Sequence, residues 1–232
     1  MKYTELSTIQ KGNCHTLNNA LLAINLTNEF LRAGCLAVNA KESGLVPKHE
    51  IGYAHTPNAT IIKVFKPWFP GYPNAPWTDA AVTQLKQSDK DFFNHVYSNN
   101  HNLGNRGGDD GYNYRGSGLN QITGFPNYFA IGNAIGVDLV NHPDELLKID
   151  VAAKACAYFT RASILQGQSL GLFKARYGIS STKEINSLQQ GATIAHQANM
   201  GWASTPAQDP TGGYQVVLAS AQSYLDFIHG GG

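Results

Sequence analysis

Two glutamates in the first quarter of the chain stand out by position as a pair of carboxylates, the minimum that cleavage of a glycosidic bond requires. Glu42 lies in the sequence AKESG, and Glu50 follows in KHEIGY. Such a cleavage needs one protonated carboxyl at the leaving oxygen and one ionised carboxylate that activates water or stabilises the oxocarbenium ion. Apolar neighbours predict that Glu42 is partly buried at the end of a helix. The alternative is that both are ordinary solvated acids.

A glycine-rich run, YRGSGLNQITGFPNY from Tyr114 to Tyr128, has the composition of a carbohydrate groove. Sugars need amides and hydroxyls for their OH groups and aromatic faces for their apolar sides, and glycines let the backbone approach a ligand closely. The run and its flank supply these groups in Tyr112, Tyr114, Gln121, Thr123, Asn127 and Tyr128. A glycine-rich turn whose polar groups satisfy one another remains an equal alternative on composition.

Other chemistries fit this run poorly. A dinucleotide fingerprint would need a glycine where Gln121 stands and a strand before it. The sequence Gly116-Ser117-Gly118 is not the G-x-S-x-G of a nucleophile elbow. Asp109 and Asp110 lack the alternating acids of a calcium loop.

The histidines and cysteines predict neither a metal site nor a disulfide framework. The histidine pairs 49/55 and 95/101 have spacings that fit no ordinary zinc motif. Cys14, Cys35 and Cys156 are far apart in sequence and predict buried or inert thiols. We therefore expect no metal and no cofactor.

The apolar pattern predicts a mainly helical scaffold for these residues. Apolar residues recur at three- and four-residue steps from Leu17 to about Ala40, with Thr16 as a candidate start and Gly44 as a candidate end of the helix. Further helices are expected over 78–98, 143–165, from a capping box at Ser181 and Glu184 to about 199, and over 214–228.

The segments between these helices are expected to be long loops that carry the function. They include the proline-rich stretch from Pro67 to Trp77, the segment 103–124 and a last loop before residue 214. We find no alternating pattern typical of a strand of any length.

The composition limits the class of partner. The chain has 232 residues, 42% hydrophobic and 14% charged, which suits one domain or two closely joined lobes with a real core. A formal net charge of +1 without a Lys/Arg block does not favour a nucleic-acid partner. The N-terminal sequence lacks a basic start followed by an unbroken apolar run, so we expect neither a signal peptide nor a membrane span. We expect a monomer made in the cytoplasm.

The motifs in their order resemble glycoside hydrolase family 19, in its branch of phage endolysins and bacterial chitinase-like enzymes. The order is ESG, E-x-x-Y, GNR and then D-G-Y-x-Y-R-G-x-G-x-x-Q-I-T-G-x-x-N-Y, and the resemblance runs from about Leu21 to Phe159. It continues weakly to Ala198-Asn199-Met200-Gly201, which is similar to the INGG of the family.

The resemblance implies a role for each matched residue. Glu42 would be the general acid and Glu50 the general base, with Thr123 holding the attacking water beside Glu50. Arg115 would support the acids electrostatically, and Gln121 and Asn127 would bind N-acetyl groups and hydroxyls. The full set of implied substrate-binding residues is Tyr53, Tyr114, Arg115, Gln121, Asn127, Tyr128 and Asn199.

Three positions depart from the family pattern. Lys41 stands where the family has histidine, Leu45 where it has a second glycine, and Ser117 where it has a second arginine. The interval between Glu42 and Glu50 is also about one residue shorter than the family pattern. These departures bear on substrate and rate more than on fold.

The sequence therefore predicts a mainly α, lysozyme-like domain over residues 1–232, with two lobes, long loops lining a central cleft and no separate wall-binding module. The expected activity is hydrolysis of β-1,4 bonds in peptidoglycan. We expect inversion, because Glu50 lies on a loop beyond Gly44 and Pro47, and Thr123 gives the water a second anchor.

Two alternatives remain. One is a chitinase, and the other is a catalytically degenerate lysozyme-like module for wall binding or for a phage tail. Peptidoglycan is preferred because the motifs are phage-like, the cysteines few and a signal peptide absent. Delivery to the wall by a holin, a phage particle or a secretion machine would fit an endolysin, a virion-associated lysozyme or an injected effector.

Overall fold

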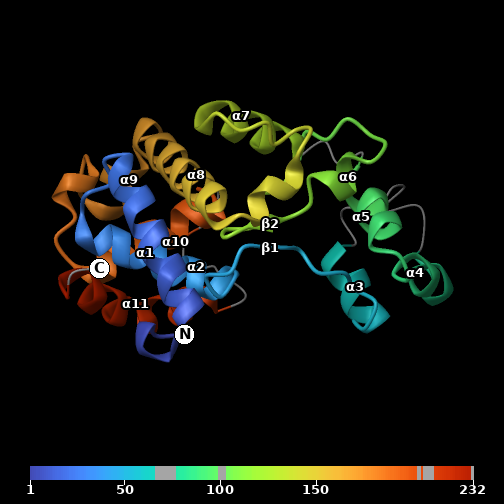
Figure 1. Cartoon of the computed structure of the whole chain (residues 1–232), viewed down its shortest axis with the longest axis horizontal. Coiled ribbons are helices and arrows are strands. Elements are labelled where there is room, and N and C mark those ends of the chain that lie inside the picture. The colour runs from blue at the N-terminus through green and yellow to red at the C-terminus, as the bar shows by residue number, and fades with distance from the viewer. Residues whose placement is uncertain (66–76, 99–102, 203–204, 206–211, 231–232) are drawn as a thin grey trace. The chain divides into compact units, whose positions relative to one another are not determined.

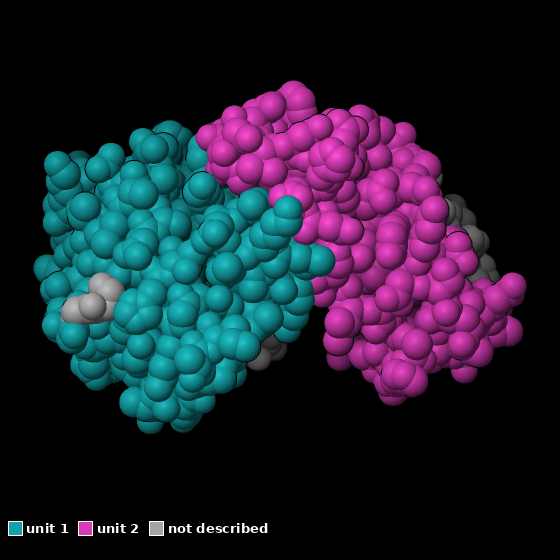
Figure 2. Space-filling model, viewed as in Figure 1, with its two compact units in different colours: residues 1–48, 118–120, 146–232 teal, residues 49–117, 121–145 magenta. Residues whose placement is uncertain are grey.

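The computed structural model describes residues 1–65, 77–98, 103–202, 205 and 212–230, and it is mainly helical. The prediction of a mainly α fold is confirmed. Two compact units divide the chain (Figure 2). Unit 1 comprises Met1–Lys48, Gly118–Asn120 and Leu146–Gly232, and unit 2 comprises His49–Ser117 and Gln121–Glu145.

Helices account for most of unit 1, and Figure 1 labels its α-helices. They are η1 (Tyr3–Glu5), α1 (Thr8–Ala23), α2 (Glu29–Glu42), α8 (Ile149–Ser169), α9 (Leu172–Tyr177), η4 (Thr182–Glu184), α10 (Leu188–Met200) and α11 (Gly213–His229).

The central helix of unit 1 is α2, which packs against α1, α10 and α11. Every residue from Leu31 to Ala40 is buried, so this helix has no solvent face over most of its length. Gly34 allows α10 to approach closely, because a Cβ there would lie 2.7 Å from the Cα of Ala192. This burial ends at Ala40, and Glu42, the last residue of the helix, is partly exposed.

One predicted helix is in fact two. We expected a single helix from Leu17 to Ala40, but α1 ends at Ala23 and α2 begins at Glu29. Asn25 breaks the helix because it adopts the left-handed conformation, with φ 64°. Asn28 then caps α2 by accepting a hydrogen bond from the N–H of Leu31 at 3.0 Å.

Of the two helix ends predicted for this region, the start differs in the structure and the end agrees. Thr16 lies inside α1, and Ser7 caps the start of that helix instead. Gly44 ends α2 as predicted: it has φ 67°, and its N–H donates to the carbonyl of Ala40 at 3.2 Å.

Unit 2 contains shorter helices. They are α3 (Asn58–Phe65), α4 (Asp79–Leu85), α5 (Asp89–Tyr97), α6 (Asp110–Asn113) and α7 (Phe125–Ile135). The helix η3 (Pro143–Leu147) begins in this unit. A two-stranded sheet pairs β1 (Lys48–His49) with β2 (Ser117–Gly118).

The predicted helix over 78–98 is also two helices. Thr78 caps α4 and Ser88 caps α5, each by accepting a hydrogen bond from a backbone N–H. The proline-rich stretch from Pro67 lies outside the described residues except for Trp77. The last loop, expected before residue 214, lies mostly outside them as well.

The remaining boundaries differ in detail. The helix expected from Pro143 is the 3-10 helix η3 followed by α8 from Ile149. Ser181 and Glu184 bracket only η4, and the cap of α10 is Ser187. The last helix, α11, is confirmed, whereas α3, α7 and α9 were not predicted.

An aromatic core holds unit 2 together. Its fully or almost fully buried members are Ile61, Phe65, Val82, Phe92, Phe93 and Val96. The glycine-rich segment begins against this core, because α6 packs on α5. Gly111 permits the close packing, since a Cβ there would lie 2.8 Å from the Cα of Asn94.

Candidate functional site

The backbone and side chain of Glu50 are both held by hydrogen bonds within unit 2. Glu50 follows β1, and its N–H donates to the carbonyl of Gly116 at 2.6 Å. The carboxylate accepts hydrogen bonds from the hydroxyl of Tyr53 at 2.9 Å and that of Tyr97 at 3.2 Å. The N–H of Gly116 lies 3.4 Å from the other carboxylate oxygen. The glycine-rich run therefore contacts this acid directly.

The two tyrosines that bind Glu50 belong to the aromatic core. The Tyr53 ring lies 5.0 Å from that of Phe65 and 4.9 Å from that of Phe92. The Tyr97 ring stacks on that of Phe93 at 5.8 Å. Each ring thus excludes water from the carboxylate while its hydroxyl replaces that water as a donor. Sequence reasoning missed Tyr97, although its i, i+4 relation to Phe93 on α5 was a usable signal.

Burial raises the pKa of Glu50 above its ordinary value. The hydrogen bonds from Tyr53, Gly116 and Tyr97, and then the charge of Arg115, act in the opposite direction. Desolvation is the largest of these effects. Glu50 is therefore a carboxylate whose proton affinity is adjusted by a built environment, as in many catalytic sites.

Gly116 is packed tightly, so a side chain there would require its neighbours to shift. A Cβ there would lie 3.0 Å from the Oε1 atom of Gln121 and 3.3 Å from the Oε2 atom of Glu50. The amide of Gln121 thus lies on the same side of Gly116 as the carboxylate. This crowding explains one of the glycines in the run.

Arg115 is buried beside the same acid. Its guanidinium donates to the carbonyl of Tyr112 and lies 4.0 Å from the centre of the Tyr112 ring. These contacts hold the positive charge in place, where it favours the ionised form of Glu50. The role in supporting both acids that the resemblance implied for Arg115 stays a prediction.

Two tyrosines of the run are core residues rather than surface groups. Tyr114 is 3% exposed and Tyr128 is 0% exposed. Their hydroxyls donate to backbone carbonyls, Tyr114 to Val140 and Tyr128 to Arg115. Their rings are buried and their hydroxyls are engaged, so both residues support the loop. The prediction that they contact a substrate directly is corrected by this burial.

The other polar residues of the run are more accessible. The hydroxyl of Thr123 is half-buried and donates to the carbonyl of Gln121 at 3.0 Å. The exposed amide of Asn127 donates to the carbonyl of Thr123 at 2.7 Å. The oxygens of both side chains can still accept hydrogen bonds. Gln121 has φ 55°, so the loop holds a strained backbone conformation at this point.

Glu42 and Asn199 belong to unit 1. Glu42 is the last residue of α2, and one of its carboxylate oxygens lies 2.8 Å from the ammonium of Lys41. Asn199 is half-buried in the last turn of α10. Lys41, one of the positions that depart from the resembled pattern, thus pairs with the neighbouring acid.

A serine, a histidine and an aspartate form a hydrogen-bonded chain that sequence reasoning missed. The Nδ1 atom of His49 lies 2.6 Å from the Oγ atom of Ser117, and its Nε2 atom lies 3.0 Å from a carboxylate oxygen of Asp144. These residue types occur in serine hydrolases. Here Ser117 is 0% exposed and also contacts the carbonyl of Arg115, so its hydroxyl cannot reach a substrate. These hydrogen bonds instead hold His49, the residue before Glu50, against Ser117 in β2.

The cysteines have no reactive character. Cys14, Cys35 and Cys156 are free and buried, as predicted. Burial raises the pKa of the Cys14 and Cys156 thiols to about 12. They are thiols that pack as apolar side chains.

Among the described residues, no group of three or more His, Cys, Asp or Glu side chains could hold a metal ion. In the same part of the chain, no helix has the length and apolar character needed to cross a membrane.

Comparison with known proteins yields no match, either to a protein-family model or to a curated protein sequence.

The pKa of Glu50 gives a test that needs no substrate. A carboxyl whose folded pKa lies above its unfolded value contributes stability at low pH, and this stability is lost as the pH rises through the folded pKa. Glu50→Gln removes the buried charge, and its oxygen can still accept from Tyr53 and Tyr97. We expect the variant to be more stable than the parent at neutral pH and to gain nothing at low pH. Thermal unfolding followed from acidic to neutral pH measures this.

Tyr53→Phe is the companion variant, because it removes a hydrogen bond that favours the ionised carboxylate. It should raise the pKa of Glu50 further and so enlarge the total loss of stability between low and neutral pH. A Glu50→Gln variant destabilised equally at every pH would contradict this view of Glu50.

Proposed function

We propose that the protein is a glycoside hydrolase that cleaves β-1,4 bonds of peptidoglycan, with Glu42 as the general acid and Glu50 as the general base. The observation that carries the proposal is the half-buried Glu50 carboxylate, held by two tyrosine hydroxyls and by the backbone of the glycine-rich run. A partly buried carboxylate destabilises the folded state, and a role in catalysis accounts best for its presence.

As base, Glu50 must be ionised when it takes a proton from water. The donors from Tyr53, Tyr97 and Gly116 and the charge of Arg115 stabilise that state against burial. The raised pKa improves the match of the base to water at ordinary pH. Activity should therefore be lost as the pH falls through the pKa of Glu50.

As acid, Glu42 must be protonated when it reaches the leaving oxygen. In the unliganded chain it pairs with Lys41, and both side chains are partly exposed. Ion pairs between partly exposed surface side chains contribute little to stability. Lys41 can therefore move away from the carboxyl at small cost when a substrate binds.

The glycine-rich run would supply the remaining contacts. Thr123 can hold the attacking water through its free lone pairs, while its O–H group donates to Gln121. The amides of Gln121 and Asn127 are suited to N-acetyl groups and hydroxyls. Gln121 lies on the same side of Gly116 as the Glu50 carboxylate. Tyr53 acts through Glu50, and Asn199 remains a candidate contact from unit 1.

The lysozyme-like architecture with a substrate cleft is part of this proposal, as is inversion at the anomeric carbon. Peptidoglycan is preferred over chitin because the motifs are phage-like and the cysteines are few. A role as phage endolysin, virion-associated lysozyme or injected effector fits equally.

The role of Glu42 is tested by Glu42→Gln, which keeps the shape of the side chain but cannot donate a proton. Loss of general-acid catalysis should lower the hydrolysis of purified sacculi by about a hundredfold or more. Release of reducing ends from sacculi, measured beside cleavage of chitin oligomers, also separates a muramidase from a chitinase.

Glu29→Gln is the matched control, since Glu29 begins the same helix and also forms an ion pair, with His229 at 3.0 Å. It should retain the activity of the parent. A folded Glu42→Gln variant with activity within about threefold of the parent, or a parent that binds walls without clearing them, would refute the proposal.

Thr123 is tested by a pair of substitutions. Thr123→Ser keeps a hydroxyl and should remain active, whereas Thr123→Val has the same shape without one and should lose rate. Thermal unfolding of both variants separates catalysis from loop support, because the hydroxyl also donates to Gln121. Equal activity of the two folded variants would remove Thr123 from the mechanism, and unfolding of the Val variant would assign the hydroxyl to the loop.

A further inference from the structure

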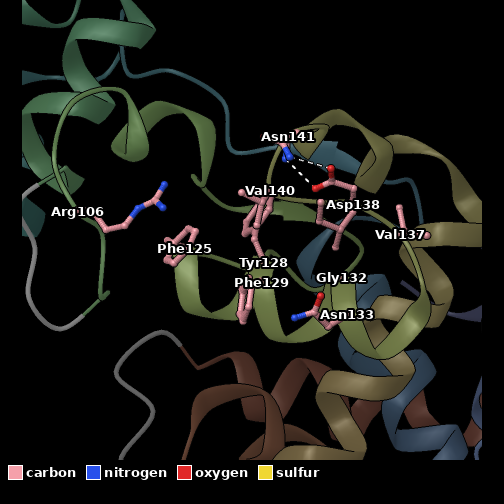
Figure 3. A pocket seen from close by; sticks show the side chains of 11 residues that line it. Arg106, Phe125, Tyr128, Phe129, Gly132, Asn133, Val137, Asp138, Val140 and Asn141 are labelled. Atoms are coloured by element: carbon pink, nitrogen blue, oxygen red, sulfur yellow. Dashed lines mark hydrogen bonds between the residues drawn. The ribbon is translucent and has the colours of Figure 1, made fainter.

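Unit 2 contains a pocket that is lined by none of the residues whose hydrogen bonds hold Glu50. It is a pocket of about 320 Å³, here called the α7 pocket, formed by α7 and the segment that follows it (Figure 3). Its lining includes Arg106, Phe125, Phe129, Asn133, Asp138 and Asn141. Pockets of this size accommodate small organic ligands.

One face of α7 forms an aromatic and polar stripe along the pocket. Phe125, Phe129 and Asn133 are spaced four residues apart, so they lie one above another on the same side of the helix. The rings of Phe125 and Phe129 stack at 6.0 Å with an angle of 26° between their planes. Phe129 is 52% exposed, so part of its ring is accessible to a ligand.

The opposite wall is fixed by glycines and by an Asx turn. Gly132 lets the following segment pack directly on α7, because a Cβ there would lie 2.6 Å from the carbonyl oxygen of Val137. Asp138 then accepts two hydrogen bonds from Asn141, at 3.1 Å from its N–H and 2.8 Å from its side-chain amide. The carboxylate is held in one orientation, and it keeps further lone pairs for a ligand.

The charges of the pocket do not favour an anion. The guanidinium of Arg106 lies 3.6 Å from the centre of the Phe125 ring, and it is already paired with Asp110 at 2.9 and 3.1 Å. Its charge is thus balanced, and it stiffens Phe125. The hydrogen bonds from Asn141 lower the pKa of Asp138, which keeps that carboxylate ionised.

We propose that the α7 pocket, whose lining contains neither Glu42 nor Glu50, is a glycan-binding site that anchors the enzyme to insoluble wall. The exposed face of Phe129 would pack against the apolar side of a sugar ring, while Asp138 and Asn133 would accept and donate hydrogen bonds to its hydroxyls. A neutral polyol matches an aromatic face, a fixed carboxylate and an exposed amide without needing a charge partner. The choice of a glycan rests on the proposed function.

The test measures sedimentation of the full chain with purified peptidoglycan sacculi, together with hydrolysis of a soluble N-acetylglucosamine tetramer. Phe129→Ala should weaken binding to sacculi by about tenfold, as removal of a central aromatic contact does. Asn133→Ala should weaken it less. Val64→Ala is the control, because Val64 is 54% exposed in the same unit and does not line the pocket.

The outcomes separate the two proposals. Wall binding that depends on Phe129 supports the α7 pocket as a glycan-binding site, even if the chain hydrolyses no glycan and the proposed function fails. Unchanged binding of a folded Phe129→Ala variant overturns this site, whatever the activity. The N-acetylglucosamine tetramer should compete with sacculi for binding, and competition by choline or free lysine in its place would overturn the site. A dimer in solution that Phe129→Ala dissociates would overturn it as well.

Discussion

The half-buried carboxylate of Glu50 is the feature on which the arrangement of unit 2 depends. Moving a carboxylate out of water costs free energy unless donors replace the lost hydration. The donors come from Tyr53 and Tyr97, whose rings are packed with Phe92 and Phe93. The same side chains therefore create the dry environment and satisfy the charge within it. The aromatic core, the short helices and the glycine-rich run can all be understood as support for this acid.

Backbone strain lies next to both glutamates. Leu45 has φ 59° just after the helix that ends in Glu42, and Gln121 has φ 55° in the run that contacts Glu50. For residues other than glycine, this conformation costs about 1–2 kcal/mol. Leu45 is fully buried in unit 1, so burial of its side chain offsets the strain. Strained residues of this kind concentrate at functional sites.

The sequence predicted what depends on local pattern, and it failed where distant residues decide. The helical class and the end of α2 at Gly44 follow from periodicity and local residue type. The helix break at Asn25 does not, because apolar residues continue on both sides of it. Tyr53 was expected to bind substrate, whereas its hydroxyl donates to Glu50.

The tyrosines show the same limit. Tyr114 and Tyr128 suggested a sugar-binding surface, but backbone carbonyls satisfy their hydroxyls and allow both rings to be buried. The contacts of Tyr97 with Glu50 and of His49 with Ser117 join residues far apart in the chain, so the sequence did not predict either pairing. The implied roles of Glu42 and Thr123 rest on motif resemblance and stay predictions.

The stereochemistry of the first-formed product tests the central claim most directly. If Glu42 protonates the leaving oxygen while Glu50 activates a water held with Thr123, cleavage proceeds by a single displacement. Proton NMR during hydrolysis of a β-linked N-acetylglucosamine oligosaccharide should then show the α-anomer first, before mutarotation. A β-anomer formed first, or a trapped glycosyl–enzyme adduct, would contradict the account, because either requires a carboxylate that attacks the sugar itself.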